Sequence, residues 1–428
     1  MIKKPFFSFT KPRLKYPVIQ SREKDIYTDI KLPEKATLLL KRPYSPIDED
    51  ILKVGDKVKT GQRVSLTNKD DQSFISPVTG SIMDISEYIG YLGLSHTSIS
   101  IKTDENEQWD DEFKKVSGTV SSENAVKFLG SIPGSPGFAS LINRETPLDT
   151  IIINGIDSDL LVTTNQFIVK TRSEILKEGI ACLKKITGIE KVILVVSPSL
   201  ANDAGKSGCE VRIIDPVYPD VLPEMIIKRV LNKIVPAGKR CEEMGVGFIN
   251  AEAIAVLADA FDKGKVPVDK ILTVINKEGL SVNVKSRIGT PVKDVLETLN
   301  IGTSYGDRLV LGGPMRGISI FSDDTPVMMD TDAIMVQDKS QVVLSSDIPC
   351  INCGECVRIC PSNIPVNMLV RLLENGLYEE AVKEYDLQSC IECGLCAYVC
   401  VARIPVFHFI MLGKNEFGKL KSMEESNA

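Results

Sequence analysis

Histidine and tryptophan are almost absent from this sequence of 428 residues, which contains two histidines and one tryptophan. His96 and His408 have no partner pattern for a metal ion or for general-base catalysis. The sequence therefore argues against a histidine-based metal centre and against acid–base chemistry that depends on an imidazole.

Long apolar runs and an excess of basic residues are also lacking. The longest purely apolar stretches, such as residues 404–407, are far shorter than a membrane span. Residues 1–7 are basic and then apolar, but no apolar core of adequate length and no small-residue cleavage site follow. The net charge is −6 and the pI is near 5.4. We therefore expect a cytoplasmic protein with no membrane span and no nucleic-acid partner.

Cysteine, in contrast, is concentrated near the C-terminus. Residues 350–361 read CINCGECVRICP, and residues 390–400 read CIECGLCAYVC. Each run has the spacing C-x2-C-x2-C-x3-C, which holds 4Fe-4S cubanes in bacterial two-cluster ferredoxins. The other three cysteines, Cys182, Cys209 and Cys241, belong to no C-x2-C pair, and we expect them to be buried or half-buried rather than reactive.

The spacing also predicts which cysteines share a cluster. Three closely spaced cysteines can wrap one face of a cubane, and the fourth cysteine of each run ligates the other cluster. Glycine after the second cysteine, at Gly354 and Gly394, lets backbone N–H groups approach the cluster sulfurs. Pro361 follows the first run as the pattern expects, whereas Val401 replaces the second proline. We assign cluster one to Cys350, Cys353, Cys356 and Cys400, and cluster two to Cys390, Cys393, Cys396 and Cys360.

Other uses of these cysteines fit the sequence less well. Disulfide frameworks need an oxidising compartment and mostly serve small secreted domains. Zinc sites usually combine paired C-x2-C knuckles rather than four cysteines in each run. Two 4Fe-4S clusters are therefore predicted, and mixed or partial cluster content and zinc remain as alternatives.

The rest of the chain predicts a multidomain α/β and α+β protein with four modules. Residues 1–115 contain short strands and turns that resemble the barrel-sandwich modules of lipoyl or biotinyl carriers. Those carriers modify a lysine at a hairpin tip. The corresponding turn here, near Thr79 and Gly80, has no lysine, so a structural module is expected.

Residues 116–262 alternate strand and helix signals. Continuous apolar strands separated by helices imply a parallel sheet that is covered on both faces. The strands are predicted at 149–155 and 191–196, and the helices at 171–187, 222–234 and 251–261.

Residues 263–335 and 336–428 form the last two modules. The first has a predicted hairpin, a helix at 291–299 and a strand at 309–311, and it resembles a soluble-ligand-binding β-grasp. The second is a two-cluster ferredoxin-like domain whose cysteine runs are joined by a helix-like stretch at 366–385. The charged tail after Gly413 is expected to be frayed.

Four ordered motifs carry a resemblance to a known family. They are DTIIING at 149–155, GVGFINAEAIAVLADAFDKGKVPVDKILTV at 245–274, LGGPMRG at 311–317, and the two cysteine runs. Together with the module order, they resemble the RnfC component of the Rnf electron-transport complex over nearly the whole chain. The α/β domain resembles the flavoprotein subunit of respiratory complex I.

Two stretches depart from that pattern. Relatives that bind NADH and FMN carry a loop of the form GxGGAxFPTxxK and an NGAECEP turn. The corresponding stretches here are GSIPGSPGFA at 130–139 and NGIDSD at 154–159, so two prolines are gained and the lysine is lost. Proline removes backbone donors that a phosphate would need. We therefore expect a retained scaffold without a working NADH and FMN site.

These features favour an electron-transfer protein over a complete enzyme. Loss of the loop with all eight cysteines resembles the proline reductase-associated electron-transfer proteins of amino-acid-fermenting anaerobes. That resemblance implies an upstream electron donor and delivery of low-potential electrons to a cytoplasmic reductase, with D-proline reductase favoured. The alternative is an NADH-oxidising FMN/iron–sulfur diaphorase subunit of an Rnf-type complex or a cobalamin-reductase-like enzyme. A scaffold that binds a ligand through its β-grasp would leave the clusters without a role.

Overall fold

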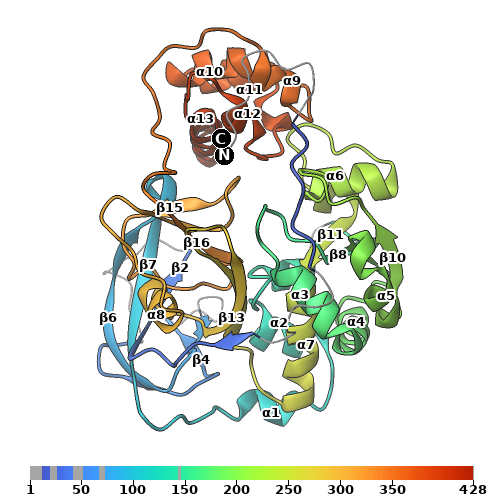
Figure 1. Ribbon diagram of the computed structural model, residues 1–428. Coiled ribbons are helices and arrows are strands. Elements are labelled where there is room, and N and C mark those ends of the chain that lie inside the picture. Colours follow the sequence, from blue (N-terminus) through green and yellow to red (C-terminus); the bar gives the residue numbers. More distant parts are fainter. Residues whose placement is uncertain (1–11, 20–26, 42–51, 67–72, 143–145, 428) are drawn as a thin grey trace.

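The computed structural model describes residues 12–19, 27–41, 52–66, 73–142 and 146–427. Within these residues the strands form four sheets, so the fold is a mixed α/β architecture of several domains. Figure 1 shows the helical C-terminal module at the top, above a β-rich body on the left and the α/β domain on the right.

The N-terminal module is a small β structure closed around its own core. One sheet has the strand order β2 (Lys35–Leu40), β7 (Ser95–Thr103), β6 (Gly80–Ile89), β3 (Lys57–Val58), and a second pairs β4 (Arg63–Ser65) with β5 (Ser73–Ile75). The turn near Thr79 and Gly80, just before β6, is buried rather than exposed like the hairpin tip of a carrier module. Thr79 is buried, and its hydroxyl donates to the carbonyl of Gln108 at 2.8 Å. A Cβ at Gly80 would stand 1.8 Å from the carbonyl oxygen of Lys102, which leaves no room for a side chain there.

The α/β domain contains the predicted parallel sheet. Its strand order is β10 (Glu210–Ile213), β9 (Lys191–Val196), β8 (Thr150–Asn154), β11 (Val246–Asn250), and all pairs are parallel. One face packs against α2 (Ser122–Leu129), α3 (Thr164–Thr171), α4 (Ser173–Thr187) and α7 (Ala251–Lys263). The other packs against α6 (Pro223–Ile226) and the π-helical turn Ile227–Leu231. Coverage of both faces is therefore confirmed, whereas β10, β11 and α3 were not predicted.

A third body is a six-stranded sheet beside the N-terminal module. Its order is β1 (Thr28–Asp29), β13 (Ser281–Arg287), β12 (Asp269–Ile275), β16 (Ala333–Gln337), β14 (Arg308–Leu311), β15 (Ile318–Ile320). The predicted hairpin is β12 and β13, which pair antiparallel. The predicted helix is α8 (Val292–Thr298), whose Val292, Val295 and Leu296 are buried against the sheet.

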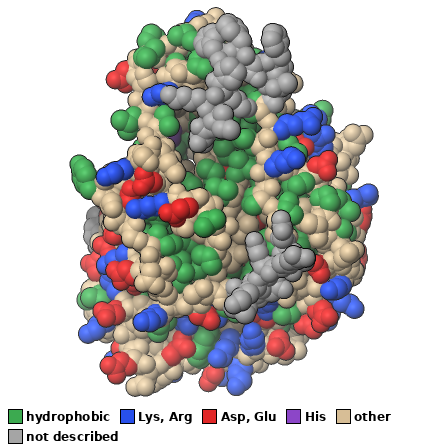
Figure 2. All heavy atoms as spheres, in the orientation of Figure 1, with side chains coloured by type: hydrophobic (Ala, Val, Ile, Leu, Met, Phe, Trp, Pro, Cys, Tyr) green, Lys and Arg blue, Asp and Glu red, His purple; other side chains and the backbone are tan. Residues whose placement is uncertain are grey.

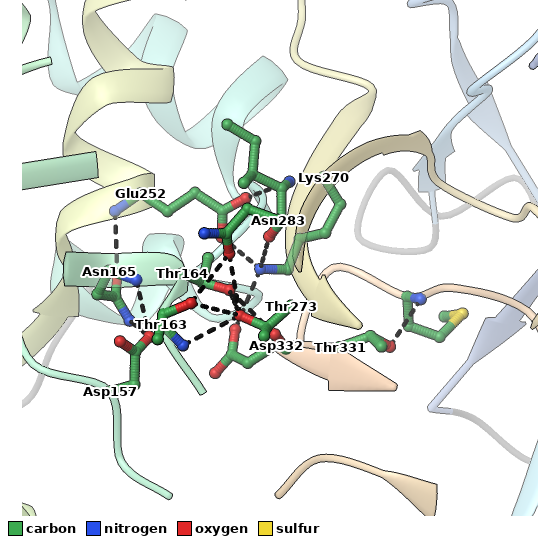
Figure 3. A network of polar contacts seen from close by, with 12 residues as sticks. Asp157, Thr163, Thr164, Asn165, Glu252, Lys270, Thr273, Asn283, Thr331 and Asp332 are labelled. Carbon is green, nitrogen blue, oxygen red and sulfur yellow. Dashed lines mark hydrogen bonds and ion pairs between the residues drawn. The ribbon is translucent and has the colours of Figure 1, made fainter. Parts of the chain in front are cut away.

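A buried polar network joins this sheet to the α/β domain (Figure 3). The ammonium of Lys270 on β12 contacts the carboxylate of Glu252 on α7 and lies 3.0 Å from that of Asp332. Lys270 is 0% exposed and Glu252 is 1% exposed. Beside them, the hydroxyl of Thr273 accepts from the backbone N–H of Thr163 at 3.0 Å. Since both ions of the Lys270–Glu252 pair are removed from water, the contact depends on both partners being present.

The C-terminal module consists of four short α-helices and one long α-helix, within the described residues. They are α9 (Glu355–Ile359), α10 (Val366–Glu374), α11 (Tyr378–Lys383), α12 (Leu395–Val399) and α13 (Val406–Asn427). The stretch 366–385 is two helices rather than one, because Gly376 adopts a positive φ of 71° and turns the chain. The prediction of a frayed tail was wrong: α13 continues to Asn427, and Gly413 packs so closely that a Cβ would stand 2.4 Å from the side chain of Leu373.

Candidate iron–sulfur site

The two cysteine runs fold into nearly identical loops that are forty residues apart. The residue before the second cysteine is left-handed in both, with φ of 56° at Asn352 and 55° at Glu392. Gly354 and Gly394 follow with φ of 76° and 71°, and each begins a five-residue helix. Successive residues of opposite hand turn backbone N–H groups inward, which is a common cradle for iron–sulfur clusters.

The repeat extends past the fourth cysteine. Asn363 and Arg403 both have a φ of 56°. The backbone N–H of Asn363 donates to the carbonyl of Cys360 at 3.3 Å, and that of Arg403 donates to the carbonyl of Cys400 at 3.2 Å. Helices α10 and α13 then begin at equivalent valines, so each fourth cysteine is held away from its own loop on a separate turn.

Three other cysteines lie close enough to Cys356 to affect its pKa. Burial raises the pKa of its thiol to about 12, and Cys350, Cys353 and Cys400 raise it further by their negative charge when ionised. Cys400 comes from the second run, so its effect on Cys356 depends on how the two runs pack together. Cys353 is the exposed member of this group.

The other four cysteines line one enclosed cavity. Cys360 of the first run lies there with Cys390, Cys393 and Cys396 of the second, among apolar side chains. Burial raises the pKa of Cys393 to about 12, with Cys390 and Cys360 adding to the shift. Cys360 therefore lies with cysteines of the other run, and the assignment of four ligands to each cluster stays a prediction.

The sizes of a single ion and of a cubane bear on what the cysteines could hold. Among the residues that the structure describes, no three His, Cys, Asp or Glu side chains form a group that could hold one metal ion. A cubane is a larger core with four thiolate ligands spread around it. The raised thiol pKa values mean that cluster binding must release protons, because only thiolates ligate. Once bound, such clusters take up and release single electrons.

Three side chains outside the cysteine runs hold the loop of cluster two. The hydroxyl of Tyr218 donates to the carbonyl of Cys393 at 2.5 Å. Nε of Arg316 donates to the carbonyl of Glu392 at 3.1 Å. Nζ of Lys414 donates to the carbonyl of Cys390 at 2.7 Å and pairs with the Glu392 carboxylate at 2.7 Å. The sequence did not predict these residues, although Arg316 lies in the LGGPMRG motif.

The altered loop at 130–139 lies beside the N-terminus of α7. Gly134, Pro136 and Gly137 of the loop line a pocket together with Glu242 and Asn250, and no described lysine or arginine lines it. The charged side chain in this lining is the carboxylate of Glu242, which would repel a phosphate group, and Pro136 has no N–H to donate.

The acidic side chains of the turn at 154–159 accept hydrogen bonds from the chain's own backbone. The carboxylate of Asp157 accepts the backbone N–H of Asn165 at 2.7 Å, and burial raises its pKa to about 7. Asp159 accepts the backbone N–H groups of Met315 and Arg316 at 3.1 and 2.7 Å. Both acidic side chains are therefore occupied within the chain.

The chain itself fills the carboxyl edge of the sheet near cluster two. Ligands of open α/β sheets bind outside the carboxyl ends of the strands. Here residues 12–19 lie in that region: Tyr16 donates its backbone N–H to the carbonyl of Pro216 at 2.9 Å. Tyr16 is buried and packs in one apolar cluster with Ile156, Tyr218 and Cys393. This part of the sheet edge is therefore occupied by the chain's own residues.

Comparison with known proteins adds to this geometry. Residues 342–401 match the 4Fe-4S dicluster domain family. The C-terminal module is therefore a 4Fe-4S ferredoxin-like domain, and the chain is an iron–sulfur electron-transfer protein.

Relatives cover most of the chain at low identity. The C component of the proton-translocating ferredoxin:NAD(+) oxidoreductase complex of Clostridium ljungdahlii is 25% identical over 83% of this chain and 82% of its own length. The C component of the Na(+)-translocating ferredoxin:NAD(+) oxidoreductase complex of Acetobacterium woodii is 25% identical over 74% of this chain and 76% of its own length. The C component of the ion-translocating oxidoreductase complex of Pectobacterium carotovorum is 25% identical over 82% of this chain, which spans 50% of that relative.

These relatives confirm the resemblance to the RnfC component of Rnf-type complexes, and none of their names refers to proline reductase. A chain of an NAD+-reducing NiFe hydrogenase in the H2-reduced state aligns with a TM-score of 0.46 and 12% identity, over 72% of this chain and 62% of that one. In the described residues, no helix combines the length and the apolar character that crossing a membrane requires.

Proposed function

We propose that this chain is the iron–sulfur electron-transfer component of an Rnf-type assembly and holds two 4Fe-4S clusters. The observation that supports this proposal is that Cys360 of the first run lines one pocket with three cysteines of the second, in a chain similar to RnfC-type relatives. Cluster one would be ligated by Cys350, Cys353, Cys356 and Cys400, and cluster two by Cys390, Cys393, Cys396 and Cys360.

The two clusters would form one electron path. Cys396 of group two is close enough to Cys356 of group one for the charge of Cys356 to raise its pKa, after the larger effect of burial. Helices α9 and α12 also pack against each other. Electrons can therefore pass between the clusters inside one module, and cluster one, with exposed Cys353, meets the solvent.

The names of the relatives suggest the partners. They describe oxidoreductases of ferredoxin and NAD(+), so we propose a ferredoxin-type iron–sulfur carrier as the one-electron partner. Because the pocket at 130–139 has no cation among the described residues and the sheet edge is filled, we propose that this chain carries no FMN or NADH of its own. Delivery to D-proline reductase stays a prediction, and the relatives favour the Rnf-type assembly over it.

Metal and sulfide analysis of anaerobically purified protein tests the proposal. We expect about eight irons and eight sulfides per chain, as two cubanes require, with absorbance that dithionite bleaches. Cys182→Ser is the matched control, since Cys182 lies outside both groups. Stoichiometric zinc with little iron would contradict the proposal.

Reoxidation of the reduced protein separates the acceptors. Reduced, desalted protein is mixed with ferredoxin, with NAD+, or with D-proline reductase and D-proline, and cluster absorbance is followed. Rapid reoxidation by ferredoxin supports the proposal. Rapid reoxidation by NAD+ alone indicates a complete diaphorase. Reoxidation by the reductase and D-proline, but not by ferredoxin or NAD+, would favour the prediction that the chain delivers electrons to D-proline reductase.

A further inference from the structure

The two cysteine runs form an internal repeat, and the same face of the loop differs in exposure between them. Around cluster two, Cys393 is 7% exposed and Leu395 is 3% exposed. Both pack in one apolar cluster with Tyr218, Leu222 and Met315 of the preceding domains. A Cβ at Gly394 would stand 2.4 Å from the carbonyl oxygen of Met315. This face of the loop is therefore closed by the chain itself.

The equivalent face of cluster one is bare within the described residues. Cys353 takes the place of Cys393 and is exposed. No described atom lies within 4 Å of a Cβ built on Gly354, the equivalent of Gly394. Ile351 is 51% exposed, whereas its equivalent, Ile391, packs in the apolar cluster around Cys393. Two loops of the same shape thus differ in whether a protein surface covers them.

Exposed apolar side chains flank the cysteines of cluster one in the sequence, before Cys350 and after Cys400. Ile348 is 57% exposed, and Val401, which replaces the expected proline, is 41% exposed. The backbone N–H of Ser346 donates to the carbonyl of Arg403 at 3.1 Å, which holds the segment of Ile348 beside the loop of Val401. Ile348, Ile351, Cys353 and Val401 form what we name the outer patch.

The charged residues nearby are of both signs, with exposed Asp347 beside Ile348 and exposed Arg403 beyond Val401. Arg358 lies 2.5 Å from Glu355, and Nδ2 of Asn367 donates to the side-chain oxygen of Asn352 at 2.7 Å. The outer patch is therefore apolar and nearly neutral. On the face in Figure 2, charged side chains likewise crowd the lower domains, and hydrophobic ones are frequent on the upper module. Binding through such a patch depends little on salt.

We propose that the outer patch is the docking surface for a ferredoxin-type iron–sulfur carrier with a small apolar face over its own cluster. The proposal rests on the proposed function. One electron leaves the reduced carrier cluster and reduces cluster one, and no bond forms or breaks. Small interfaces suit such transient redox encounters, and the covered loop of cluster two shows the kind of apolar surface that fits.

The test uses the full anaerobic protein and a purified bacterial two-cluster ferredoxin, reduced by dithionite and desalted. Stopped-flow absorbance gives the second-order rate of electron transfer. We expect Ile351→Glu to lower this rate about tenfold or more and Ile351→Leu to keep it. Val54→Glu is the matched control, because Val54 is an exposed apolar residue of the N-terminal module. Raising the salt concentration should change the wild-type rate less than about threefold.

Iron content and the electron paramagnetic resonance spectrum of each variant separate docking from cluster damage. We expect both to stay at the wild-type values in Ile351→Glu. Intact clusters with an unchanged rate in both Ile351→Glu and Val401→Glu would overturn the docking surface and leave the proposed function standing. A wild-type protein without about eight irons would overturn the proposed function itself. If Ile351→Glu turns a dimer into a monomer in sedimentation, the patch binds a second copy and the carrier assignment is wrong.

Discussion

Removing the buried ammonium of Lys270 should weaken the joint between the α/β domain and the six-stranded sheet. Lys270→Met leaves Glu252, which is 1% exposed, without its counter-ion. Asp332 retains 29% exposure and can be hydrated. Breaking a buried pair from one side typically costs about 3–5 kcal/mol, and we expect a loss of that size in the free energy of unfolding.

Urea unfolding, followed by circular dichroism and by Trp109 fluorescence, measures the loss. The double variant Lys270→Met/Glu252→Gln should recover part of it, since it removes the uncompensated charge. Lys383→Met is the control: its ion pair with Glu379 is largely exposed, so it should cost less than about 1 kcal/mol.

The pH dependence of the Lys270→Met deficit has a definite sign. Burial raises the pKa of Glu252, with Lys270 opposing the shift, so removal of Lys270 raises it further. A carboxyl with a higher pKa in the folded state binds more protons there, and stability rises as pH falls. The deficit should therefore shrink as the pH falls from about 8 to about 5. A loss below about 1 kcal/mol, or one that grows at low pH, would refute this reasoning.

Three further predictions follow from the site. Cys400→Ala should damage the cluster of the first run and Cys360→Ala that of the second, which spectroscopy of each variant checks; loss of the cluster of its own run in each case would contradict the crossed ligation. Gently purified protein should retain little FMN and show slow NADH:viologen activity, because no described cation lines the pocket at 130–139; stoichiometric FMN would refute this. Burial raises the pKa of Asp157 from 3.8 to about 7, so the folded state keeps a proton that the unfolded state loses above pH 3.8. The contribution of this residue to the free energy of unfolding is therefore fully present below pH 3.8 and is lost as the pH rises through about 7. The free energy of unfolding of the wild type minus that of Asp157→Asn should fall over that pH range in urea titrations, and a difference independent of pH would contradict the raised pKa.

Local patterns predicted the elements whose formation depends on their own residues. The apolar strands at 191–196 and 150–154 were predictable because parallel strands buried on both faces read as continuous apolar runs. The stretch 366–385 was predicted as helix-like without the turn at Gly376, which divides it into α10 and α11. The helical order of α13 was missed, and α13 packs against α10 and α11, contacts that a charged local sequence does not reveal.

The sequence by itself determined the chemistry of the cluster module. Ligand number and spacing reside within two short runs, and three closely spaced cysteines can wrap one face of a cubane by local geometry. Only the tertiary structure decided how the two cysteine loops differ. The runs are nearly the same in pattern, but Tyr218, Arg316 and Lys414 reach one loop from distant elements. Burial and hydrogen bonds between elements far apart in sequence cannot be read from spacing, so only packing determines that one cluster loop lies inside the protein and the other at its surface.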